Sequence, residues 1–259
     1  MPVPEMKRRQ RDPVKMRHEL RRAALLTSGA GIGFGVLSVI SWWLLGKDRD
    51  AVMAVEDPWS YYADVGVGGT AVAGLYLLPF AAILFLWFIV ALRGWIRGSG
   101  RRRNMLISDL QLVSGVAFTA VFLVGSGAIA TSIIVSASSG SEVTFGSLRS
   151  LTAFGTTLMS VMGVRMAGIF VIATSTVGMT TGVLPRWFNI LGYVFGGLLM
   201  ISPVVEASFM LAFPIWVTAL SVMLLYHLAN VPDDQLPGFA ARYVDADDDE
   251  EGLGRGVSA

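Results

Sequence analysis

The chain has 259 residues, of which 54% are hydrophobic and only 15% are charged. A soluble domain carries about a quarter charged residues, so this composition excludes an ordinary soluble protein. The net charge of +1 gives no reason to expect nucleic acid as a partner, and the absence of cysteine excludes disulfides and thiol chemistry. The charges gather in islands between apolar runs long enough to cross a bilayer, which predicts an all-α polytopic membrane protein.

Residues 1–22 are basic and are predicted to form a cytoplasmic tail. The apolar run 23–46 predicts the first transmembrane helix. A cleaved signal peptide is the alternative, but the run exceeds the 7–15 residues of a signal's apolar region. It also ends in Trp42-Trp43, a pair typical of a membrane interface. Four glycines in it do not fit the dinucleotide fingerprint and are spaced for close helix packing: Gly29, Gly31, Gly33 and Gly35.

Three further apolar runs predict helices at 67–92, 105–136 and 147–181. Pro79 lies inside the first of these and is an expected kink. The polar segment between the first two holds Arg101, Arg102 and Arg103, the best candidates for contact with anionic lipid headgroups. Setting the membrane topology is the simpler explanation of the same charges.

The runs 187–201 and 204–229 predict a short fifth helix and a sixth helix, which complete a transmembrane domain at 23–229. Pro203 is interpreted as a turn because a residue before proline is pushed out of the helical region. If Pro203 only kinks one helix, the count falls to five and the C-terminal tail moves outside. Residues 230–259 end in an acidic run and are expected to be a disordered cytoplasmic tail.

Cytoplasmic loops carry the excess of lysine and arginine. With the N-terminus inside, 16 basic residues fall on the cytoplasmic side, 3 on the outer side, and Arg165 is left within the membrane. We therefore expect six helices with both termini in the cytoplasm, in the inner (plasma) membrane of a cell.

The sequence shows no catalytic machinery. The two histidines, His18 and His227, have no carboxylate at metal-ligand spacing, and no serine sits in a G-x-S-x-G sequence. We expect a protein that is not an enzyme and that uses no cofactor and no metal.

Arg165 lies near the middle of the fourth predicted helix. A charge at that depth is rare and is by default a functional-site hypothesis with a partner to be found. Small residues form a stripe along one face of this helix, and Arg165 lies about 180° from its centre. The stripe consists of Thr152, Thr156, Ser160, Gly163, Ala167 and Thr174.

Two main explanations of Arg165 remain open. It pairs with a carboxylate or with backbone carbonyls, or it lines a pathway for an anionic ligand. Snorkelling to the cytoplasm is hampered because helical side chains lean toward the N-terminus, which is the outer side for this helix. Glu206 from the outer side and Asp109 from the inner side are the candidate carboxylates, and the backbone of the fifth helix is a further candidate.

The fifth predicted helix is short and rich in glycine. Short segments interrupted by glycine or proline mark binding sites in transporters built from inverted repeats, although the two halves of this chain show no convincing match. Gly192 and Gly196 are equally explained by helix packing.

The segment 182–192, with the sequence GVLPRWFNILG, resembles a recurring feature of uncharacterised bacterial six-helix integral membrane proteins. In those proteins a P-R-W turn precedes a short glycine-bearing helix. The resemblance covers about a quarter of the chain and implies a membrane location, with Arg186 at the cytoplasmic interface and Trp187 as its anchor. It implies nothing about activity.

Two functions follow as expectations. The first is an accessory subunit or a lipid-associated module, whose partners are the bilayer, its anionic headgroups, and a partner membrane protein or further copies of the chain. The alternative is a small transporter or channel component that binds an anionic ligand at Arg165 and the fifth helix.

Overall fold

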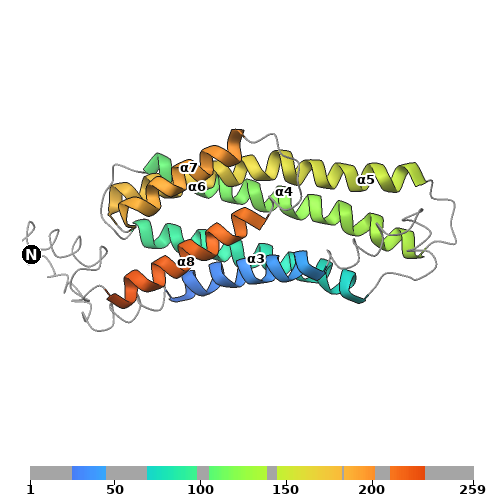
Figure 1. Ribbon diagram of the computed structural model, residues 1–259, viewed down its shortest axis with the longest axis horizontal. Helices are drawn as coiled ribbons and strands as arrows, with labels where there is room; N and C mark the ends of the chain where they lie inside the picture. Colours follow the sequence, from blue (N-terminus) through green and yellow to red (C-terminus); the bar gives the residue numbers. More distant parts are fainter. Residues whose placement is uncertain are drawn as a thin grey trace, which may run out of the picture.

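The computed structural model describes residues 25–44, 69–97, 105–138, 145–182, 184–201 and 211–230. These segments are almost entirely helical and pack side by side into an elongated bundle (Figure 1). The helices are Leu25–Leu44 (blue in Figure 1), α3 (Gly69–Arg97), α4 (Met105–Ser138), α5 (Phe145–Thr157), the π-helical segment η2 (Leu158–Gly163), α6 (Val164–Thr181), α7 (Arg186–Ile201) and α8 (Ala212–Asn230).

Four stretches are long and apolar enough to cross a membrane. They are Leu25–Leu44, Gly74–Arg93, Leu106–Thr131 and Arg149–Thr181, whereas the apolar parts of α7 and α8 are shorter. This agrees with the all-α membrane class that the composition predicts. The basic tail 1–22, Arg101, Arg102, Arg103 and Glu206 lie outside the described residues.

Most helix limits lie within a few residues of the predicted ones, with one difference that bears on the site. The segment after the second predicted helix was expected to be a loop from Arg93 onward, but α3 continues to Arg97. Arg93 is therefore a helical residue. Pro79 lies inside α3, as expected from the sequence.

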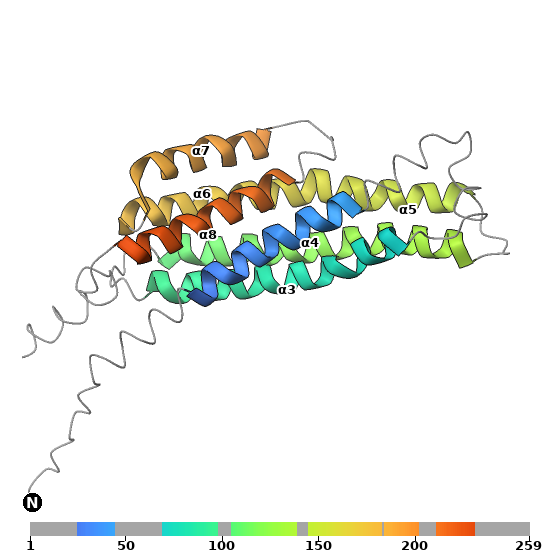
Figure 2. The same cartoon turned by 60° about the horizontal axis from the view of Figure 1, so that its bottom comes forward.

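Contacts with α6 show that α7 runs antiparallel to it. A β-carbon placed on Gly178, near the end of α6, would lie 2.5 Å from Asn189 Oδ1, near the start of α7. A β-carbon on Gly168, near the start of α6, would lie 2.9 Å from the Gly196 carbonyl oxygen, in the second half of α7. Both views of the bundle show α7 lying against α6 on its outer side (Figures 1 and 2).

In contrast, α8 runs parallel to α6. Phe213, at the start of α8, packs edge-on against Phe170 with ring centroids 5.9 Å apart. Leu224, further along α8, lines a small cavity together with Thr181 at the end of α6. The chain therefore reverses direction between α7 and α8. The predicted turn at Pro203 lies outside the described residues.

The turn from α6 to α7 follows from local sequence. Gly182 has a φ of 72°, a left-handed conformation that glycine adopts without strain, and its N–H donates to the Gly178 carbonyl over 3.0 Å. Pro185 then precedes α7, and its carbonyl accepts the N–H groups of Phe188 and Asn189. The turn thus satisfies backbone groups at both helix ends.

Phenylalanines from five helices fill the middle of the bundle. Phe85 of α3 lies at the centre, with ring centroids 4.7 to 6.2 Å from those of five other phenylalanines. The five are Phe34, Phe88, Phe118, Phe170 and Phe213. Such tilted and edge-on contacts are the favourable geometries for aromatic pairs.

The outside of the bundle is apolar, and its inside holds small polar side chains. Exposed side chains include Trp87, Val113 and Val194, while Ser114, Thr174 and Ser221 are buried. Many of the buried hydroxyls donate to a carbonyl one turn earlier, as Thr174 does to Phe170 over 2.7 Å. Internal satisfaction of polar groups beneath an apolar surface is the pattern required in lipid.

Glycines allow α7 to approach α6 closely, which gives a testable contrast between two neighbours. A β-carbon on Gly196 would lie 2.7 Å from Ile172 Cγ1 and 2.9 Å from the Gly168 carbonyl, whereas one on Gly197 meets nothing within 4 Å. Overpacking costs about 1–3 kcal/mol. We expect Gly196→Ala to lower the free energy of unfolding in detergent by this amount.

Gly197→Ala is the matched control for this substitution. It should be neutral or stabilising by up to about 1 kcal/mol, since alanine is the better helix former. Equal effects of the two substitutions on thermal unfolding would contradict the close approach of α6 and α7.

Candidate functional site

Arg165 lies on the face of α6 that is turned away from the core. Ala167, with no exposed surface, and the buried Phe170 point into the bundle. Ala167 is about 200° further round the helix than Arg165, so the two side chains leave in nearly opposite directions. Arg165 is half-buried, and Met162, one turn earlier on the same side, is 49% exposed.

Arg165 also lies at the middle of the apolar belt. It is the central residue of the 33-residue apolar stretch Arg149–Thr181. Gly163 lies beside Val121, within three residues of the middle of the apolar stretch of α4. The neighbouring α4 therefore places Arg165 near the depth of its own centre, independently of the position of Arg165 in α6.

The helix is π-helical immediately before Arg165. In η2 the Val164 N–H donates to the Met159 carbonyl, five residues back, instead of four. The Arg165 guanidinium leans toward this segment and its Nη1 donates to the Val161 carbonyl over 2.6 Å. π-helical turns are frequent at functional sites, and here one coincides with the charged residue.

The last turn of α7 approaches α6 one turn beyond Arg165. Met200 of α7 approaches Gly168, one turn beyond Arg165 in α6, and α7 ends at Ile201. The C-terminus of a helix carries a partial negative charge and unpaired carbonyls, and both favour a nearby cation. This is the fifth-helix backbone that the sequence offered as a candidate partner.

Asp109 is not placed to neutralise Arg165. Gln111, two residues further along α4, donates to Thr174 Oγ1 over 2.9 Å. Thr174 is nine residues beyond Arg165, which corresponds to about 14 Å of helix. Asp109 instead forms an ion pair with Arg93 of α3. Of the two predicted carboxylate partners, one is therefore engaged elsewhere, and the other, Glu206, lies outside the described residues.

The ion pair between Arg93 and Asp109 closes one end of the α3–α4 hairpin, and we expect its contribution to stability to be small. The Asp109 side chain is 54% exposed, and exposed pairs contribute about 0–1 kcal/mol. Asp109→Asn should therefore change the thermal unfolding temperature only slightly. A large loss of stability would show that this pair, rather than helix packing, holds the hairpin together.

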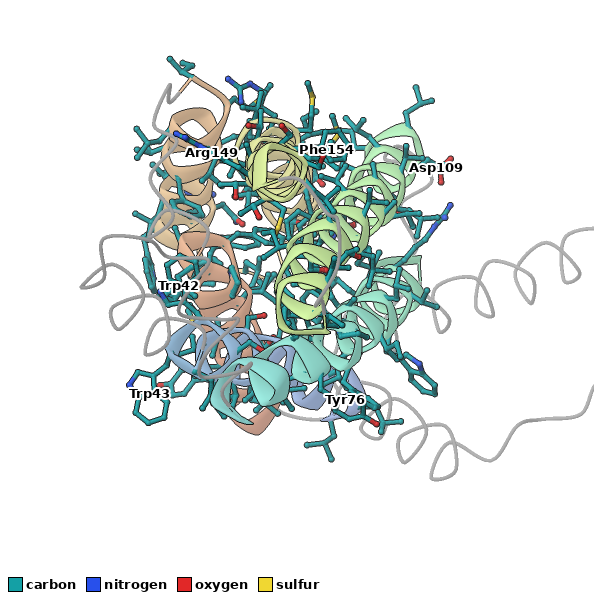
Figure 3. All side chains as sticks on the ribbon, turned by 90° about the vertical axis from the view of Figure 1, so that its right-hand side faces the viewer. Trp42, Trp43, Tyr76, Asp109, Arg149 and Phe154 are labelled. Atoms are coloured by element: carbon teal, nitrogen blue, oxygen red, sulfur yellow. The ribbon has the colours of Figure 1, made fainter. Side chains whose placement is uncertain are left out.

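Aromatic residues mark the opposite end of the bundle. Trp43 is 58% exposed and Tyr76 is 69% exposed, and both side chains point away from the bundle (Figure 3). Tryptophan and tyrosine favour the boundary between membrane and water. The described part of the chain holds no group of three or more His, Asp or Glu residues placed to hold a metal ion.

The geometry thus brings together a mid-depth arginine, a π-helical turn and the end of a short helix. Comparison with protein-family models, curated proteins and solved structures finds no match for this chain. The resemblance of residues 182–192 to six-helix bacterial membrane proteins therefore stays a prediction.

Proposed function

We propose that the chain is a non-enzymatic subunit of a membrane assembly, in which Arg165 binds an acidic side chain from a transmembrane helix of a partner protein. The observation that carries this proposal is the direction of Arg165. Its side chain leaves α6 at mid-depth on the side that carries α7, at about the level where that helix ends, and another helix can approach it there.

The hydrogen-bonding capacity of Arg165 supports the same function. A guanidinium has five N–H donors, and one bond to the Val161 carbonyl is the only hydrogen bond it forms within the described residues. A charged side chain at the bilayer centre costs at least about 2.5–3.5 kcal/mol when it is not paired. A carboxylate facing it would supply a charge-assisted, bidentate partner.

The phenylalanine cluster argues against a pathway through the middle of the bundle. Phe118 and Phe170, which lie within five residues of the level of Arg165, both pack on the central Phe85. Arg165 points away from these rings. An open channel along the bundle axis does not fit this arrangement.

The proposed orientation follows the positive charges of the sequence. It places the bundle end that carries Asp109 in the cytoplasm and the end that carries Trp43 outside, in the plasma membrane. The opposite directions of α7 and α8 support a C-terminal tail on the same side as the N-terminal tail. The contact of Arg101, Arg102 and Arg103 with anionic headgroups belongs to the same proposal.

Purification from native membranes in mild detergent tests the proposed role as a subunit. We expect one partner membrane protein at a fixed stoichiometry, retained through size-exclusion chromatography. A monodisperse, protein-free monomer obtained under several mild detergents would contradict it.

A second function is favoured by the short helices. The end of α7 and the start of α8 both lie near the level of Arg165, since Met200 approaches Gly168 and Phe213 packs on Phe118. Helix ends near mid-membrane bind substrates and ions in several transporters. Liposomes that contain the reconstituted chain are then expected to take up anions, and Arg165→Gln should abolish this uptake. If the wild-type chain transports no anion, the transport function is contradicted and the proposed role as a subunit remains.

A further inference from the structure

Two neighbouring cavities share part of their lining. The larger lies where the Leu25–Leu44 helix, α3, α4 and η2 meet, and the smaller lies between α4, η2, α6, α7 and α8. The larger has a volume of about 100 Å³ and the smaller about 40 Å³, and Phe122 and Met159 line both. Residues that line the larger are Ser38, Trp42, Leu75, Leu78, Phe122, Ser126, Ile129, Met159 and Leu211.

The cavities extend from the middle of the apolar belt toward one membrane surface. The smaller one is lined by Ala167 and Phe118, at the level of the phenylalanine cluster. The larger one reaches Trp42, eight residues or about 12 Å beyond Phe34 along its helix. Since half of the hydrocarbon core is about 15 Å thick, the pair follows most of one leaflet.

Several lining residues of the larger cavity, among them Leu75 and Leu78, are half-buried, so the cavity reaches the surface of the bundle from the side. Its walls are mostly aliphatic and aromatic. A lining of this kind favours an apolar occupant over water. Entry from the lipid phase therefore fits both the position and the lining.

Ser38 gives this cavity a chemical preference. Its side chain is 6% exposed and lines the cavity, and its hydroxyl has no hydrogen-bond partner among the described residues. Many other buried hydroxyls, such as that of Ser221, donate to the carbonyl four residues earlier. Those of Ser28 and Ser108 also lack a partner among the described residues, but they line neither cavity. A buried hydroxyl without a partner is costly and is satisfied by an acceptor brought by a ligand.

We propose that this cavity binds a lipid-soluble molecule with a small apolar ring and a carbonyl oxygen, the chemistry of a membrane quinone. The ring occupies the space between Phe122 and Leu78, and the carbonyl accepts a hydrogen bond from Ser38. This site is independent of Arg165, which lies on the face of α6 opposite the core.

Binding of ubiquinone-1 to the full chain in nanodiscs tests the proposal. We expect saturable binding of one molecule per chain, weakened about five- to tenfold by Ser38→Ala, the effect of losing one neutral hydrogen bond. Leu75→Trp should abolish binding by filling the cavity. Ser114→Ala should leave affinity within about twofold, since the Ser114 hydroxyl bonds to the Gln111 carbonyl and lines neither cavity.

Three outcomes would overturn the proposal. The first is no saturable binding by the wild-type chain. The second is equal affinity of wild type and Ser38→Ala. The third is displacement of ubiquinone-1 by a short-chain phospholipid with equal affinity for wild type and Ser38→Ala, which would mark a site for acyl chains without selection for a carbonyl. Thermal unfolding of each variant confirms that it is folded.

Discussion

Replacement of Phe85 by alanine is expected to lower the free energy of unfolding by about 2–4 kcal/mol. Phe85 has no exposed surface and contacts the rings of five other phenylalanines. In lipid the solvent around an unfolded helix is as apolar as the core, so the transfer part of the usual 3–5 kcal/mol is reduced. The cavity and the lost packing contacts remain.

Phe80→Ala is the matched control for Phe85→Ala. Phe80 lies in the same helix, is 46% exposed, and has a ring contact with the exposed Tyr76. Its loss should cost less than about 1 kcal/mol. Thermal unfolding in one detergent would compare the two variants directly, and similar losses would contradict a central role of the cluster.

Replacement of Arg165 by glutamine is expected to weaken binding of the partner protein while leaving the stability of the isolated chain nearly unchanged. Removing one partner of a buried ion pair costs about 3–5 kcal/mol, so affinity for the partner protein should fall at least about 100-fold. The isolated chain should keep its stability within about 1 kcal/mol, because one bond to the Val161 carbonyl is lost while the burial of a charge is relieved.

Three further variants make the Arg165 experiment specific. Arg165→Lys keeps the charge and should retain part of the affinity for the partner protein. Arg149→Gln, in the same continuous helix formed by α5, η2 and α6, should leave that affinity unchanged. If Arg165 were neutralised within the chain by Glu206, Arg165→Gln and Glu206→Gln would each destabilise the isolated chain, and the double variant would cost less than their sum. That result would contradict a partner from outside.

The sequence predicted the helices well because they are defined by composition over long windows. The fifth helix was expected at 187–201 and is found at 186–201, since Gly182 and Pro185 mark the turn before it. Close packing was also predictable where glycines are four residues apart, as at Gly192 and Gly196.

What sequence patterns do not contain is the register between helices. The pairing of Arg93 with Asp109 depends on α3 continuing past the apolar run and on the way the hairpin closes. The phenylalanine cluster likewise joins residues from five helices that share no local pattern. The π-helical segment before Arg165 contains no proline, and the serine and glycine that it does contain also occur in the α-helices of this bundle.

The position of Arg165 was predictable, but its environment was not. Helical periodicity correctly placed it opposite the stripe that faces α4, where Gly163 lies beside Val121. Helical periodicity did not show that α7 ends near the level of Arg165, because this placement depends on the antiparallel packing of Gly168 against Gly196.

The central claim is that an acidic residue of another transmembrane helix lies against Arg165. A photo-crosslinking amino acid at Met162, which is exposed one turn before Arg165, tests it in native membranes, with the same group at Leu123 of α4 as control. We predict one protein adduct from position 162 alone, mapped to a transmembrane peptide with an aspartate or glutamate near its middle. Adducts only to lipid, or only to this chain's own residues, would contradict the claim.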